Sequence, residues 1–316
     1  MRFYLAPLEE ITGYIYRNAL HDFYGEGIDK YFMPFLAPHT KRSFNAKEKN
    51  DILPEHNKGM YTVPQVLTNS AKDFLRIEKD LRAFGYEEIN INLGCPSGTV
   101  VSKGRGAGFL AEPEKLDQFL EEVFTKTEAK ISLKTRIGFD EPEEFYRLLE
   151  IYNKYPLKEL IIHPRVRQEL YKGKPHLETF CYAMEHSTNP LCYNGDIVSK
   201  ESYVNLLAEL GNKEVPAVMI GRGVLKNPAL ISELAEMPGI KAGVGLEKEK
   251  LRAFHDRLLA DYQSVLSGDK NVLFKMKELW SYLIELFPGA EKEAKAIRKA
   301  ERLSEYQAVV NRVFMD

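Results

Sequence analysis

One cysteine stands where a thiol could do chemistry. Cys95 lies between Gly94 and Pro96, directly after the apolar run 87–94. An inert buried cysteine needs neither neighbour, whereas a thiol that leaves the end of a strand needs a break in the regular backbone. An unperturbed thiol has a pKa of about 8.5 and keeps its proton at neutral pH. We therefore predict that Cys95 is a proton donor.

A lysine on another apolar run indicates an anionic partner. In segment 130–137, Ser132, Lys134 and Arg136 alternate with apolar residues, so the three polar side chains share one face of a strand. If the apolar face packs against helices, Lys134 points to the interior. A buried ammonium group without a partner is costly, so we predict an anionic or electron-accepting group beside it.

Two glycine-containing segments could hold a phosphate. Asn194, Gly195 and Asp196 follow one apolar run, and Gly221 and Arg222 follow the next. Glycine lets backbone N–H groups approach an anion, and arginine adds a charge-assisted hydrogen bond. We predict a phosphate site formed by these two segments. The run GRGAG at 104–108 lacks the spacing of a dinucleotide fingerprint and follows a loop, so it indicates a mobile loop over the substrate.

The elements that must position these residues are short apolar runs that alternate with amphipathic segments of helical period. Such alternation is typical of repeated βα units and a parallel sheet. The segment 113–124, for example, places its apolar residues on one helical stripe. The predicted strands are 2–8, 30–37, 60–67, 87–94, 130–137, 159–163, 191–194 and 217–220.

Eight strand–helix units favour a closed (β/α)8 TIM barrel over an open sheet. The candidate residues follow the C-terminal ends of their strands, which form the reactive rim of such barrels. Beyond residue 240 the strand pattern stops and only helical segments follow. We therefore predict a catalytic barrel at 1–240 and an all-helical domain at 241–316.

The helical segment is slightly basic, with 14 Lys and Arg against 12 Asp and Glu, although the whole chain has a net charge of −2. Within it, Lys295, Arg298, Lys299 and Arg302 are spaced i, i+3, i+4 and i+7, which puts them on one helical face. Such a stripe is either a solvated surface or part of a nucleic-acid contact.

Cysteine usage and hydropathy narrow the class of protein. Three cysteines at irregular spacing favour a reduced, cytoplasmic protein over a disulfide framework or a metal site. The N-terminus lacks a secretory signal and no apolar run is long enough to cross a membrane, so we expect neither a membrane nor a metal partner. The oligomeric state stays open, and a monomer is compatible with the sequence.

Seven segments, in order, resemble the tRNA-dihydrouridine synthases. The most specific is ININLGCPSGTVVSKGRGAGFL at 89–110, in which Asn-x-Gly-Cys-Pro precedes a Lys-Gly-x-Gly loop. The others are APLEEIT, VPQVLTNS, SLKTRIG, IHPRVRQELYKG, YNGDI and MIGRGVLKNP, and together they extend from Leu5 to Pro228. The resemblance implies an enzyme that reduces a tRNA uridine with bound FMN, which NADPH reduces transiently.

The resemblance also implies roles for individual residues. Cys95 would protonate C5 of the uridine while the reduced flavin delivers hydride to C6, and Lys134 with His163 would lie beside the flavin ring. FMN would be held by Ala6, Pro7, Gln65, Lys134, His163, Asn194, Gly195, Asp196, Gly221 and Arg222. The tRNA would be bound by Asn92, Lys103, Arg136, Arg165, Arg167, Lys295, Arg298 and Lys299.

Two other functions remain to be weighed. A flavin barrel that reduces a free pyrimidine, as dihydroorotate dehydrogenases do, is disfavoured by the helical domain and the Lys-Gly-x-Gly loop. A tRNA-binding protein without catalysis is disfavoured by the presence of Cys95, Lys134 and His163 together. The departures from the family pattern, at Leu8 and at Arg105 and Pro164, remove no reactive group.

Overall fold

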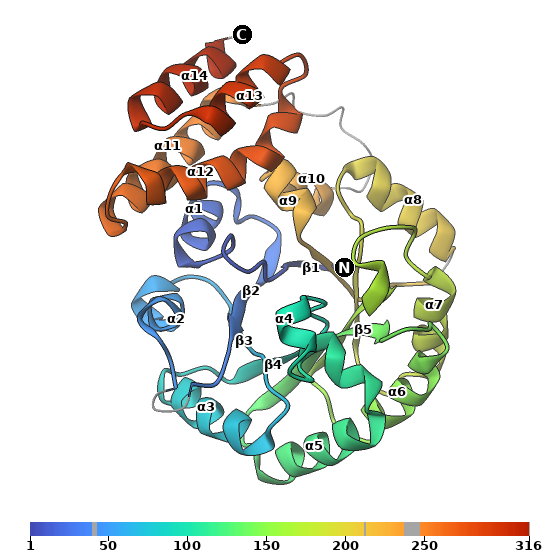
Figure 1. Cartoon of the computed structure of the whole chain (residues 1–316). Helices are drawn as coiled ribbons and strands as arrows, with labels where there is room; N and C mark the ends of the chain where they lie inside the picture. The colour runs from blue at the N-terminus through green and yellow to red at the C-terminus, as the bar shows by residue number, and fades with distance from the viewer. Residues whose placement is uncertain (40–42, 212, 237–246, 316) are drawn as a thin grey trace.

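The computed structural model describes residues 1–39, 43–211, 213–236 and 247–315. Its centre is a closed barrel of parallel strands in which each strand pairs with the next and β8 pairs with β1 (Figure 1). The strands are β1 (Arg2–Leu5), β2 (Ile28–Leu36), β3 (Thr62–Val66), β4 (Glu88–Leu93), β5 (Lys130–Gly138), β6 (Glu159–Val166), β7 (Leu191–Asn194) and β8 (Ala217–Ile220). The predicted TIM barrel is therefore confirmed. β1 ends earlier than predicted and β6 continues beyond its predicted end.

Helices connect the strands, and α1 to α3 with α5 to α8 form a ring around the barrel (Figure 1). Their bounds are α1 (Tyr14–Tyr24), α2 (Ala46–Ile52), α3 (Ala71–Ala83), α4 (Gly98–Val101), α5 (Pro113–Lys126), α6 (Glu144–Tyr152), α7 (Leu177–His186), α8 (Lys200–Leu210), α9 (Arg222–Lys226) and α10 (Leu230–Ala235). Three short 3-10 turns are η1 (Pro54–His56), η2 (Gly106–Ala111) and η3 (Arg167–Glu169). The helix predicted at 113–124 is α5, whose apolar stripe is buried against the barrel.

The barrel has two apolar layers and a polar floor. On β5, Ile131 and Leu133 pack outward in the layer between strands and helices, while Ser132 faces inward. The alternation predicted for this strand is therefore confirmed. At the floor, Lys30 Nζ pairs with Glu88 (2.9 Å) and Glu159 (3.2 Å), so this buried ammonium group has carboxylate partners.

The C-terminal helices are α11 (Lys248–Val265), α12 (Asp269–Leu283), α13 (Glu291–Lys299) and α14 (Leu303–Met315), with the 3-10 turn η4 (Ile284–Leu286). They lie on one side of the barrel, where α11 packs against α1 (Figure 1). The ring of Phe254 meets the rings of Tyr16 and Tyr24 edge-on, and Arg257 pairs with Asp22 at 3.1 Å. The predicted boundary between residues 240 and 241 lies outside the described residues.

The basic stripe is shorter than predicted. Lys295, Arg298 and Lys299 are exposed on α13, but this helix ends at Lys299 and α14 begins at Leu303. Arg302 therefore lies between two helices, where it pairs with Glu305, and the prediction that it continues the helical stripe is wrong. The spacing alone did not reveal the helix end.

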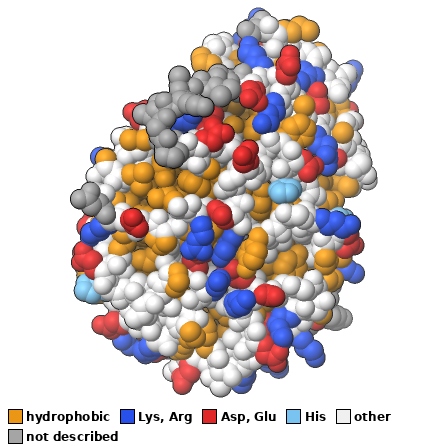
Figure 2. Space-filling model, turned by 180° about the vertical axis from the view of Figure 1, so that it is seen from behind, with side chains coloured by type: hydrophobic (Ala, Val, Ile, Leu, Met, Phe, Trp, Pro, Cys, Tyr) orange, Lys and Arg blue, Asp and Glu red, His pale blue; other side chains and the backbone are white. Residues whose placement is uncertain are grey.

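No helix among the described residues is long and apolar enough to cross a membrane, and their His, Cys, Asp and Glu side chains form no cluster suited to a metal ion. On the face opposite to that of Figure 1, basic and acidic side chains are interspersed (Figure 2). That face therefore presents no field of a single sign to a polyanion.

Candidate active site

The mouth of the barrel holds two adjoining cavities. The thiol cavity, with a volume of about 490 Å³, is lined by Cys95, by residues within β3, β5 and β6, and by the loops that follow β1 and β6. The inner cavity, of about 80 Å³, lies between the ends of β7 and β8. Five residues line both: Pro7, Leu8, Lys134, His163 and Tyr171. All the residues predicted to bind the cofactor line one of these two cavities or both.

The turn that carries Cys95 is held by Asn92. Its side-chain oxygen accepts the backbone N–H groups of Gly94 (3.0 Å) and Cys95 (2.9 Å), and its Nδ2 donates to Gln65 Oε1 (2.7 Å). Strict alternation would place Asn92 and Cys95 on opposite faces, but this turn lets both line the thiol cavity. Asn92 therefore positions Cys95, in addition to the substrate contact predicted from the sequence.

The amide network extends below the cavity. Gln65 Nε2 donates to Asn90 Oδ1 (2.8 Å), and Asn90 Nδ2 donates to Ser132 Oγ (2.9 Å). The strand register places Gln65 beside Asn90 and Asn90 beside Ser132. A connected chain of hydrogen bonds across β3, β4 and β5 fixes these side chains more firmly than isolated pairs would.

The glycine-rich segment forms the wall behind Cys95. The N–H of Ala107 donates to the carbonyl oxygen of Cys95 (3.0 Å), and a Cβ at Gly106 would lie 2.8 Å from that oxygen. Gly106 also has a φ of 55°, which favours glycine. The structure thus packs Gly106 and Gly108 of this segment into η2, with Gly104 in the preceding turn, whereas the sequence indicated a loop over the substrate. Lys103 precedes η2 and is exposed.

The environment of Cys95 keeps its thiol protonated. Burial raises the pKa of Cys95 above its ordinary value, and the nearby carboxylate of Glu9 adds to the effect. Lys134 and Arg136 act in the opposite direction but do not reverse it. A thiol whose pKa is raised holds its proton throughout the neutral range, as the predicted proton donor must.

Lys134 is a half-buried cation that faces both cavities and has no carboxylate partner among the described residues. It projects from β5 beside Asn92 of β4. Burial, helped by the neighbouring Arg136, lowers the pKa of Lys134 to about 8, and no carboxylate of the described residues offsets this. Lys134 is therefore still mainly charged at neutral pH, and an anionic group in the cavity would stabilise it.

His163 is neutral. Burial lowers the pKa of His163 well below its ordinary value, and the positive charges of Arg136 and Lys134 lower it further. Arg165 Nη1 donates to His163 Nε2 (3.2 Å), so the imidazole proton lies on Nδ1. Between the two residues predicted beside the flavin, only Lys134 supplies a positive charge.

Two arginines predicted to contact RNA lie inside the protein. Arg165 is 0% exposed, lines neither cavity, and donates to the carbonyls of Lys172 (3.1 Å) and Gly173 (2.5 Å). Arg165 therefore cannot meet an RNA phosphate in this structure, and that prediction is corrected. Arg136 is 1% exposed and donates to the carbonyl of Val166 (2.9 Å), but it lines the thiol cavity and can meet a group that enters there.

Asp196 pairs with two arginines beside the inner cavity. Its carboxylate accepts from Arg165 Nη1 (3.0 Å) and from Arg222 Nη2 (2.9 Å). A single carboxylate between two guanidinium groups leaves this end of the cavity net positive. In this arrangement Asp196 orients the two arginines, and the anion site stays a prediction.

Strained backbone gathers at the mouth. The described non-glycine residues with positive φ are Glu10 (66°), Leu170 (53°) and Asp196 (47°), which lie in the loops after β1, β6 and β7. Left-handed conformations of such residues persist only where the surroundings hold them, and they cluster at functional sites. The surroundings therefore hold these three loops in a fixed conformation at the mouth of the barrel.

Two residues at the site escaped the sequence analysis. Tyr171 lines both cavities, lies under the guanidinium of Arg222 at 4.4 Å and stacks near His163. Glu9 lines the thiol cavity. Both lie within the segments that resemble the family, but neither their spacing nor their residue type predicts a place at the site. By contrast, Arg167 was predicted to bind RNA and is half-buried over the ring of Phe139.

The fold and the site together define a (β/α)8-barrel protein with a protonated thiol and an anion-seeking cavity at its mouth. The description of the dihydrouridine synthase (Dus) family matches residues 4–313. The chain belongs to this family.

Individual relatives are more distant. tRNA-dihydrouridine synthase B of Pasteurella multocida is 28% identical over 72% of this chain and 67% of its own length. Probable tRNA-dihydrouridine synthase 1 of Synechocystis is 29% identical over 66% of this chain and 58% of its own length, and a Staphylococcus aureus relative is 27% identical over 72% and 69%. A solved variant of NCR from Zymomonas mobilis, at 14% identity, overlays with a TM-score of 0.49 and covers 75% of this chain and 88% of its own.

Proposed function

We propose that this protein reduces uridine to 5,6-dihydrouridine in tRNA, with bound FMN and with NADPH as the source of electrons. The observation that carries the proposal is the shared cavity of a protonated Cys95 thiol and a counter-ion-free Lys134. Family membership supports the reaction. The names of the relatives support tRNA as the substrate.

The residues at the mouth fit FMN. Lys134 and Arg222 offer positive charge to a phosphate and to a reduced flavin ring. At Gly195 a Cβ would lie 3.1 Å from Tyr193 Oη, and at Gly221 it would lie 3.4 Å from Ala6 Cβ, so glycine leaves room where side chains would crowd the inner cavity. When bound, FMN would supply the hydride for C6 of the uridine.

Cys95 completes the reduction of the C5–C6 double bond. Its thiol donates a proton to C5, which forms the second new C–H bond, and the resulting thiolate regains a proton from solvent. Asn92 and η2 hold the thiol in place from two sides. Lys134 stabilises negative charge beside it. In this scheme the barrel, residues 1–240, performs the chemistry, and the helices of 241–316 bind tRNA together with basic residues such as the exposed Lys103 and the half-buried Arg167.

The first expected outcome concerns the cofactor. Purified protein should be yellow and contain about one FMN per chain, because one inner cavity with one net positive rim is present at the mouth. Absorbance near the flavin bands and chromatography of the released nucleotide measure the amount and identity. A colourless protein that cannot take up added FMN would refute the cofactor.

The second expected outcome concerns the basic stripe on α13, which consists of Lys295, Arg298 and Lys299. Changing both Lys295→Glu and Arg298→Glu should weaken tRNA binding about tenfold and reduce its salt dependence, because phosphate contacts release counter-ions. The flavin content should not change. The matched control is Lys72→Glu with Lys79→Glu, two exposed lysines on α3, which lies far from α13 (Figure 1). Equal affinities of the α13 variant and the wild type, measured by fluorescence anisotropy, would make the stripe a solvated surface.

A further inference from the structure

The loop between β1 and α1 closes one side of the thiol cavity. Its residues Leu8 and Glu9 line that cavity. The loop is a compact turn, because Thr12 Oγ1 accepts the N–H of Leu8 (2.8 Å) and the N–H of Thr12 donates to the carbonyl of Leu8 (3.0 Å). Whatever holds this turn therefore also sets the shape of the cavity.

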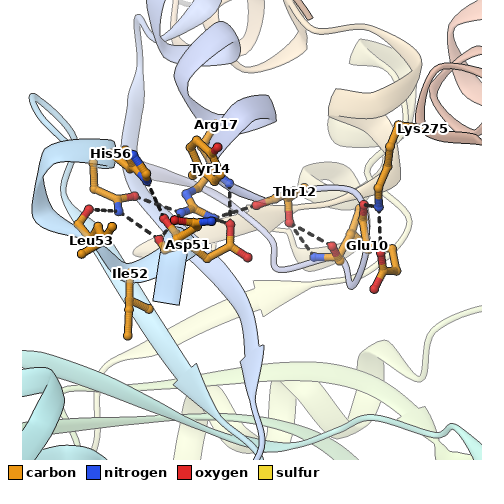
Figure 3. Close-up of polar contacts among 12 residues, drawn as sticks. Glu10, Thr12, Tyr14, Arg17, Asp51, Ile52, Leu53, His56 and Lys275 are labelled. Carbon is orange, nitrogen blue, oxygen red and sulfur yellow. Dashed lines mark hydrogen bonds and ion pairs between the residues drawn. The ribbon is translucent and has the colours of Figure 1, made fainter. Parts of the chain in front are cut away.

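A buried arginine anchors the end of the loop that leads into α1. Arg17 of α1 is fully buried and donates to the carbonyl oxygens of Thr12 (2.8 Å) and Asp51 (2.8 Å). Asp51 in turn accepts the N–H of Tyr14 at 2.6 Å. Figure 3 shows these contacts on one side of Thr12 and the contact of Glu10 with Lys275 on the other.

The middle of the loop, at Glu10, is held by the C-terminal helices. Lys275 of α12 donates from Nζ to the backbone carbonyl of Glu10 (2.6 Å) and to its carboxylate (2.7 Å). Glu10 has the left-handed φ of 66°, and Lys47 of α2 also pairs with it. Burial alone would raise the pKa of Glu10, but the two ammonium groups lower it to about 2. The carboxylate of Glu10 is therefore ionised throughout the neutral pH range, and its contact with Lys275 is an ion pair.

Lys275 makes this contact although its own helix offers a carboxylate. Glu278 lies three residues further along α12, at the spacing of a common helical ion pair. Its Oε2 is buried and has no hydrogen-bond partner among the described residues. Lys275 is thus bonded across to the barrel loop in place of its helical neighbour.

We propose that Lys275 is a positioning residue for the reaction, through which the C-terminal helices hold Glu10 and so keep Leu8 and Glu9 against the cavity that contains Cys95. The inference rests on the proposed function. The described contact between Arg257 and Asp22 joins the same helices to α1 but does not touch this loop. Docking of the helices and shaping of the cavity are therefore separable by mutation.

The test compares Lys275→Met with Lys275→Arg, and uses Arg257→Met as the matched loss of a helix–barrel ion pair. The first readout is turnover with saturating tRNA, alongside tRNA affinity and flavin content. The second is the rate of Cys95 alkylation by iodoacetamide as a function of pH, followed by mass spectrometry of its peptide. That readout does not require activity, because a displaced Glu9 and a more open cavity both lower the pKa of Cys95.

The expected result is a loss of turnover of about tenfold in Lys275→Met, the scale of a misplaced active-site group, with tRNA affinity within about twofold. Alkylation of Cys95 should shift to lower pH, Lys275→Arg should restore both properties, and Arg257→Met should leave both unchanged. If Lys275→Met does not fold, Glu10→Gln replaces it; this change removes the ion pair but keeps the bond to the backbone carbonyl, so smaller shifts in the same directions are expected.

Wild-type turnover and an unshifted alkylation profile in Lys275→Met would overturn the inference, as would equal effects in Arg257→Met. A wild-type protein that does not reduce tRNA uridine would refute the proposed function. In that case a shift in alkylation confined to Lys275→Met would still support the positioning of the loop, and no shift would overturn it.

Discussion

Replacing Cys95 with alanine is expected to lower uridine reduction by about 10²- to 10⁴-fold, the contribution of a positioned general acid. The variant should keep its flavin and its affinity for tRNA, because the turn around residue 95 is held by backbone bonds to Asn92 and Ala107 that alanine preserves. Dihydrouridine formed in a single turnover with unmodified tRNA measures the effect. In the wild type, the rate should persist at neutral pH and fall only as the pH rises through the raised pKa of Cys95.

The matched control for this variant is Cys181→Ala. Cys181 is a half-buried cysteine on α7 that lines neither cavity, so its loss should leave the reaction unchanged. Full activity of Cys95→Ala would show that another group supplies the proton. Loss of flavin together with activity in that variant would show that Cys95 serves binding and would equally contradict the proposed role.

The barrel could be predicted because its strands are buried on both faces and read as short apolar runs. The end of β6 could not. Pro164 lacks an N–H, and proline is disfavoured inside a strand. β6 nevertheless continues to Val166, because the register shifts between Arg136 and Gly138 of β5, where a ladder bond is dispensable. Likewise, the helical spacing of basic residues continues to Arg302 and predicts one helix, although α13 ends at Lys299.

In the site, too, features set by the order of the strands could be predicted, whereas features set by contacts between distant residues could not. Residues at the strand ends share one rim, so Cys95, Lys134 and the glycine-containing segments could be placed together from their order alone. The burial of Arg165 could not be predicted, because its partner Asp196 lies 31 residues away and the carbonyls around it belong to a loop that folds back. An arginine in a basic segment reads as exposed until its acceptors are known. Tyr171 was missed for the same reason.

Replacing Lys134 with methionine is expected to make the flavin-free protein more stable and the enzyme at least about 10²-fold slower. Because the pKa of Lys134 is lowered to about 8 in the fold, the charged form costs about 3 kcal/mol at neutral pH. The unfolded chain binds more protons between pH 8 and the ordinary pKa of lysine. The cost is therefore fully present below pH 8 and disappears as the pH rises through that interval, so the wild type should approach the variant in stability at high pH.

Lys30→Met is the matched control, because both lysines project into the barrel but only Lys30 has carboxylate partners. Its loss leaves Glu88 and Glu159 buried without their shared cation, so the free energy of unfolding should fall by about 3–5 kcal/mol. Thermal and urea unfolding of the two flavin-free variants should thus move in opposite directions. A destabilised Lys134→Met protein would mean that Lys134 serves the fold. Higher stability combined with weakened FMN binding would support the proposal that Lys134 binds the cofactor and lowers the stability of the flavin-free protein.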